Sequence, residues 1–171
     1  DPHSLTLLPD LSLPDAVAAF KSGQGDFIHL PEPAAEQLIS DGTASLSVAL
    51  GPVNGHIAYS SFAATEAYLE RNTETVHRFI RGYARGLTWL RESDPATVGD
   101  AVSGFFPDAP SELITKSVAR YKEQGTWPAI PHLEQPEYEG LEEILMGAGM
   151  VKEHQPYAKI VRPEIVREAL A

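Results

Sequence analysis

The chain has 171 residues, 43% hydrophobic and 22% charged, which is typical of one globular domain with its own hydrophobic core. Its 13 basic and 24 acidic residues give a net charge of −11, and the basic residues are scattered, so we expect no nucleic-acid partner. The absence of cysteine excludes disulfides, thiolate metal sites and cysteine nucleophiles.

The first part of the chain is predicted to alternate strands and helices. Residues 5–8 form a short apolar run, and a helix opens at Pro14 and Asp15. Residues 27–30 form a second apolar run, after which Pro31 and Pro33 forbid a strand and suit the first turn of a helix. This strand–helix–strand–helix order predicts a parallel βαβ crossover.

The end of the second predicted strand is a candidate ligand site, because ligands of open α/β sheets bind beyond the carboxyl ends of the strands. His29, Pro31 and Glu32 lie at this point. Glu32 either accepts hydrogen bonds from a ligand or interacts with the free N–H groups that begin the next helix. His29 either lines the cleft or has a structural role.

The rest of the chain divides near Phe62. Residues 44–50 and 56–62 are predicted to be extended, with a loop at 51–55 between them. After Phe62 the pattern is helical, and a long helix begins at Asn72 and Thr73. Its apolar face consists of Val76, Phe79, Ile80, Tyr83, Ala84, Leu87 and Leu90.

Motifs for catalysis and metal binding are missing from the sequence. The six histidines show no HxxxH or HExxH spacing, and no GxSxG elbow is present. We therefore expect no catalytic residue, no metal site and no cofactor. Residues 1–4 have neither a basic region nor an apolar region, so we expect no signal peptide in this chain.

Four motifs in order resemble a known family. They are residues 16–20 followed by Gly23-x-Gly25-Asp26, the Glu32–Pro33 pair, residues 72–76, and residues 148–151 before Tyr157. In this order the chain resembles the carboxyl-terminal half or more of periplasmic solute-binding proteins of the nitrate/sulfonate/taurine and thiamine-precursor group, known as NMT1/THI5-like.

The resemblance implies a partial α/β fold of the type II periplasmic-binding-protein kind, in which two lobes close over a ligand. Residues 1–55 would be the remainder of the second lobe, with a βαβ unit. Residues 56–62 would be the crossover strand, and residues 63–171 a helix-rich return segment belonging to the first lobe. Family members are nearly twice as long, so a missing N-terminal lobe or a second chain is expected to cover the helical part.

The resemblance also implies a function, that of the solute-binding component of an ABC importer without enzymatic activity. Its partners would be an ABC permease and a small polar or anionic ligand of the sulfonate, nitrate-like or pyrimidine type. Its location would be periplasmic or extracellular, with a lipoprotein anchor as one form. The expected ligand contacts are His29, Pro31, Glu32, Asn54, Tyr59 and Ser60.

Two alternatives stay open at this point. One is an enzyme on the same fold, acting on a small heteroaromatic or carboxylate substrate with His29 or Glu32 as acid or base. The other is a ligand-sensing module of a larger receptor. For Tyr59, a core position with a hydrogen-bonded hydroxyl is the alternative to a ligand contact.

Overall fold

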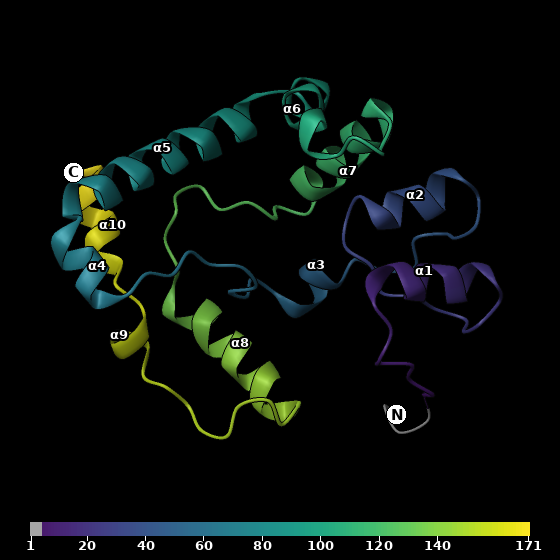
Figure 1. Ribbon diagram of the computed structural model, residues 1–171, viewed down its shortest axis with the longest axis horizontal. Coiled ribbons are helices and arrows are strands. Elements are labelled where there is room, and N and C mark those ends of the chain that lie inside the picture. The colour runs from purple at the N-terminus through teal and green to yellow at the C-terminus, as the bar shows by residue number, and fades with distance from the viewer. Residues whose placement is uncertain (1–4) are drawn as a thin grey trace.

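The computed structural model describes residues 5–171 (Figure 1). The expectation of no signal peptide concerns residues 1–4, which lie outside the described residues. Helices account for all the regular structure among residues 5–171. Their order is α1 (Leu13–Lys21), α2 (Ala34–Ser40), α3 (Leu50–Asn54), α4 (Glu66–Arg71), α5 (Thr73–Glu92), α6 (Pro95–Val102), the 3-10 turn η2 (Ser103–Phe105), α7 (Ser111–Glu123), α8 (Gln135–Gly147), α9 (Tyr157–Ile160) and α10 (Pro163–Leu170).

The predicted α/β fold is wrong, because the part of the chain that the structure describes contains no strand and no sheet. Residues 5–8, 27–30, 44–49 and 56–62 are not paired into a ladder. An apolar run specifies a strand only when a neighbouring strand takes up its backbone N–H and C=O groups. The βαβ second-lobe remainder and the crossover strand are therefore not formed in this structure.

The helices predicted near Pro14, Pro33 and Thr73 are confirmed as α1, α2 and α5, whereas most of the loop predicted at residues 51–55 is the short helix α3. Local side chains explain where the helices begin. Asp94 caps α6, since its carboxylate accepts a hydrogen bond from the backbone N–H of Thr97 at 3.0 Å, and Pro95 occupies the first turn. Thr65 caps α4 in the same way through the N–H of Tyr68 at 3.2 Å. After α2, Gly42 takes the positive φ of 75° that a helix end favours.

The main hydrophobic core lies between α6 and α7. Val98, only 1% exposed, packs with Leu113, Ile114 and Val118. Gly99 allows this approach, because a Cβ there would lie 2.7 Å from the Thr115 hydroxyl. Helix α2 packs on α7 from the other side, which positions the segment that precedes α2 (Figure 1).

Many large apolar side chains remain uncovered. The accessible surface is 12049 Å², whereas a compact monomer of 18.6 kDa exposes about 8,200 Å². Helix α5 is an example. It packs against α10 and buries Ile80 and Leu87, but Phe79 and Tyr83 on the same predicted apolar face stay exposed. The chain therefore exposes more surface than a compact domain of this size, and many large apolar side chains contribute to it.

Candidate functional site

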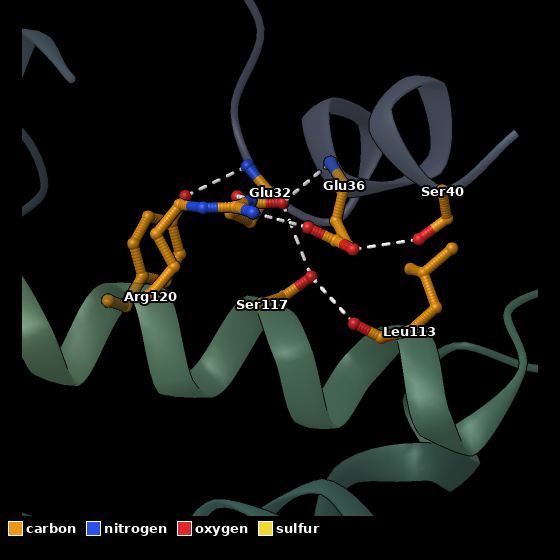
Figure 2. Close-up of polar contacts among 7 residues, drawn as sticks. Glu32, Glu36, Ser40, Leu113, Ser117 and Arg120 are labelled. Atoms are coloured by element: carbon orange, nitrogen blue, oxygen red, sulfur yellow. Dashed lines mark hydrogen bonds and ion pairs between the residues drawn. The ribbon is translucent and has the colours of Figure 1, made fainter. Parts of the chain in front are cut away.

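The candidate site is the segment 27–33, which is attached to α7. The hydroxyl of Tyr121 accepts a hydrogen bond from the backbone N–H of Glu32 at 2.9 Å. Ser117, one turn earlier on α7, shares its single hydroxyl proton between the Glu32 carboxylate at 3.2 Å and the carbonyl of Leu113 at 2.9 Å (Figure 2). Both the backbone and the side chain of Glu32 are thus bound to one helix.

Arg120 joins two carboxylates at the start of α2. Its guanidinium donates to Glu32 through one terminal nitrogen and to Glu36 through the other (Figure 2). The Glu32 and Glu36 side chains are only 5% and 4% exposed, and that of Arg120 is 20% exposed. The N–H of Glu36 donates to Glu32 at 3.0 Å, and Ser40 donates to Glu36 at 2.7 Å.

These contacts shift the acid–base equilibria of two groups. Burial is the largest single influence on Glu36 and opposes its ionisation, but hydrogen bonds from Ser40 and Arg120, with the charges of Arg120 and Lys116, hold its pKa below the ordinary value. Burial likewise disfavours the charged Arg120, yet Glu32 and Glu36 together raise its pKa above the ordinary value. Glu36 and Arg120 are therefore both ionised at neutral pH.

Glu32 is a predicted ligand contact, and the structure gives its carboxylate protein partners. It accepts from Arg120, Ser117 and the N–H of Glu36. The last of these is the helix N-terminal role that the sequence left open as an alternative. A ligand that binds the Glu32 carboxylate has to compete with Arg120, so this contact stays a prediction.

The other predicted ligand residues lie on two exposed segments. His29 and Pro31 are exposed on the segment attached to α7. Asn54 is the last residue of α3, and Tyr59 and Ser60 follow it, Tyr59 being 85% exposed. Within residues 5–171, the hydrogen bonds and ion pairs do not join these two segments to each other. The six predicted residues therefore lie on two separate stretches of the chain, three on each.

The second segment is held by α8. The backbone N–H of Ala58 donates to the carbonyl of Glu137 at 3.0 Å, and Gly140 of α8 would place a Cβ 3.4 Å from Ile57. In Figure 1 this stretch runs between α3 and α4 past the N-terminal end of α8. Tyr59 and Ser60 are thus next to a fixed backbone contact, with their side chains exposed.

The sequence did not identify Ser117, Arg120 and Tyr121 as site residues. The available signal was their spacing: Ser117, Arg120 and Tyr121 follow Leu113 at one helical face, so a polar stripe borders the apolar one. The pattern could not identify carboxylates that lie 84 to 88 positions away in the chain.

A second polar cluster fixes the loop after α8. Glu142 accepts hydrogen bonds from the N–H of Gln155 at 2.8 Å and from the Tyr138 hydroxyl at 3.0 Å, and its other oxygen lies 3.1 Å from Nδ1 of His154. Since Glu142 is buried and all these partners are local, we assign the cluster to holding the loop.

A groove of about 310 Å³ lies between α4, α5 and α10. Glu66, Glu70, His77 and Glu168 are among its lining residues, and Arg162, also in the lining, pairs with Glu66. The groove contains none of the six predicted ligand residues. In residues 5–171, no cluster of three or more candidate ligands could hold a metal ion, and no helix is long and apolar enough to cross a membrane.

The sequence of the chain is similar to that of a protein named as a binding protein. It is 28% identical over 169 residues to a Bacillus subtilis (strain 168) protein named "Putative binding protein YtlA", which covers 98% of this chain and 51% of the relative. The chain therefore spans about half the length of that relative. No family model and no solved structure matches. The similarity supports a binding protein, and it does not confirm the NMT1/THI5-like group.

Proposed function

We propose that the chain is part of the solute-binding component of an ABC importer, which holds a small polar or anionic ligand and passes it unchanged to an ABC permease. The observation that carries the proposal is the similarity to a binding protein along 98% of the chain. The resemblance of its motifs to nitrate/sulfonate/taurine and thiamine-precursor binding proteins supports the transport role. That role requires a periplasmic or extracellular location.

The proposed ligand contacts are His29, Pro31, Glu32, Asn54, Tyr59 and Ser60. None of these is Lys or Arg, so an oxyanion such as a sulfonate or nitrate would be held by neutral donors. The amide of Asn54, the hydroxyls of Tyr59 and Ser60 and a ring N–H of His29 are such donors. A pyrimidine-type ligand would use the same groups and could place an amino group on an acceptor.

We propose that the remaining half of a longer polypeptide covers the exposed apolar side chains and completes the ligand cleft. Two observations support this partner. The accessible surface exceeds that of a compact monomer of this mass, and the relative is about twice as long as the chain. A second copy of the chain is the competing occupant, and size-exclusion chromatography with light scattering distinguishes the two.

A thermal-shift screen of the full-length protein tests the binding role. The probes are ethanesulfonate, nitrate, 4-aminopyrimidine and benzoate, with proton NMR of each organic probe to detect turnover. We expect one class to raise the Tm by several degrees without being consumed, because a ligand that binds only the folded state stabilises it. Consumption of a probe would favour the enzyme instead, and no shift with any probe would argue against this ligand class.

Matched variants locate the ligand. Ser60→Ala and Tyr59→Phe each remove one hydroxyl and are expected to weaken probe binding about tenfold, the cost of about one hydrogen bond to a polar ligand. Ser61→Ala is the control, since it removes a hydroxyl from the neighbouring exposed position. Equal affinities in all three variants would remove residues 59 and 60 from the proposed contacts.

A further inference from the structure

We propose that Arg120 is a positioning residue, which holds the segment 27–33 on α7 so that His29 and Pro31 are presented to a ligand. The effect on binding rests on the proposed function, whereas the effect on the conformation of the segment does not. Arg120 would act through Glu32 and Glu36 without touching the ligand.

The geometry of the contact supports this role. The carboxylates of Glu32 and Glu36 lie close together at the start of α2, because the guanidinium of Arg120 contacts both. A guanidinium is a planar fork with two terminal nitrogens, and Arg120 uses one for each carboxylate. Lysine has a single ammonium nitrogen and is therefore a poor substitute for joining both.

The contacts of Arg120 belong to a fixed network. Tyr121, the next residue on α7, binds the backbone N–H of Glu32 at 2.9 Å, and Ser117 binds its carboxylate at 3.2 Å. Pro31 is one residue before Glu32, and His29 is three residues before it. Both of these side chains are exposed. The attachment of Glu32 to α7 holds the backbone next to them, and this is how it positions them.

The charges make Arg120 the critical member of the network. Two nearly buried carboxylates share one guanidinium. The charge of Lys116 also acts on Glu36, but Lys116 forms its ion pair with Glu112 at the surface. Without Arg120 the two carboxylates repel each other and lose their strongest hydrogen bonds, and both effects favour release of the segment into water. Ser117 and Tyr121 are neutral and do not compensate the charge.

Hydrogen–deuterium exchange of the full-length protein tests the conformational effect. We expect Arg120→Gln to raise exchange of the peptide covering residues 27–38 by about tenfold or more, with Arg120→Lys intermediate. Tyr121→Phe, which keeps the ring against Trp127, is expected to raise exchange at Glu32 alone. Arg81→Gln, which breaks the exposed contact with Glu74, is the matched control.

The same variants test the effect on binding. The probe is whichever of ethanesulfonate, nitrate, 4-aminopyrimidine and benzoate stabilises the wild-type protein, and Kd is measured well below the Tm of every variant. We expect Arg120→Gln to weaken the Kd at least about tenfold, with partial rescue in Arg120→Lys. A purely structural arginine would lower the Tm and leave this Kd unchanged.

The outcomes separate the two proposals. Unchanged exchange at residues 27–38 in Arg120→Gln would overturn the positioning role, as would raised exchange with an unchanged Kd. If no probe binds the wild-type protein but exchange at residues 27–38 rises, the anchoring by Arg120 stands and the proposed function fails. If Arg120→Gln exchanges throughout the chain, Arg120→Lys decides by the same two measurements, because it keeps the charge and loses the fork that joins both carboxylates.

Discussion

The hydroxyl of Tyr121 accepts a hydrogen bond from the backbone N–H of Glu32 at 2.9 Å, although 89 positions separate the two residues. The contact joins the segment before α2 to α7, and Arg120 extends it to Glu36 in the first turn of α2. Because this contact places the predicted ligand segment, its chemistry can be tested by stability as well as by binding.

Replacing Arg120 by Met is expected to lower the free energy of unfolding by about 3 kcal/mol at pH 7, because it leaves nearly buried carboxylates without their cation. The loss should shrink as the pH falls to about 4, since protonation of an uncompensated buried carboxyl removes its charge. Urea unfolding of the full-length protein at the two pH values measures both effects. Arg81→Met, at an exposed ion pair, should change stability little at either pH.

The carboxyl of Glu36 gives the wild-type protein an acid-sensitive element. Its pKa in the folded protein lies below the ordinary value of 4.5, so its contribution to stability is present above pH 4.5 and is lost as the pH falls through the lowered pKa. Glu36→Gln should therefore flatten the decline of the Tm as the pH falls from about 5 to about 3, a range that starts above the ordinary pKa and extends below it. An unchanged slope would mean that Glu36 does not titrate in the folded protein as described.

Two glycines should respond to alanine in opposite directions. Gly99→Ala is expected to cost about 1–3 kcal/mol, because its Cβ would lie 2.7 Å from the Thr115 hydroxyl in the α6–α7 core. Gly82→Ala, in the interior of α5 with no atom within 4 Å of its Cβ, is expected to stabilise by about 0.5–1 kcal/mol. Urea unfolding measures both, and a stabilising Gly99→Ala would contradict the close packing of the two helices.

Helices could be predicted from the sequence because their signals are local. Asp94 and Pro95 define the start of α6 within one turn, and the apolar spacing from Val76 to Leu87 defines α5. The predicted strands fail for the opposite reason. Residues 27–30 satisfy the apolar pattern of a strand, but a strand also needs a neighbour to pair with, and the structure of residues 5–171 supplies none.

The candidate site could be predicted only in part for a related reason. The two prolines around Glu32 predict that it lies at the start of a helix, and the structure confirms a helix that begins at Ala34. Its partner Arg120 is 88 positions away and looks like any basic residue near a helix end. Contacts of this kind depend on how α2 packs against α7, which no local pattern encodes.

Glu142 should determine the conformation of the loop after α8. The N–H of Gln155 is the largest of the influences that lower its pKa, with His154 and Tyr138 adding to it against the opposing effect of burial. Glu142→Ala is expected to raise deuterium exchange across residues 148–156 and leave α6 and α7 unchanged. Glu143→Ala is the control, because Glu143 is the exposed neighbour on the same helix. Equal exchange in the two variants would remove Glu142 as the anchor.

Phe62 offers a direct test of whether another part of the protein covers the apolar surface. It packs edge-on against Phe79 and Tyr83, with ring centroids 4.8 Å and 5.1 Å apart, yet it is 71% exposed. The 171 residues contain no cysteine, so Phe62→Cys gives one new thiol in this region of the full-length protein.

We expect maleimide to label Phe62→Cys at least about tenfold more slowly than Glu112→Cys, because labelling then requires local opening of the covering part. Glu112 is a suitable reference, since its side chain is 80% exposed and paired only with Lys116 at the surface. Equal labelling rates would show that the aromatic cluster stays open to solvent, and the proposed covering half would then have to dock elsewhere.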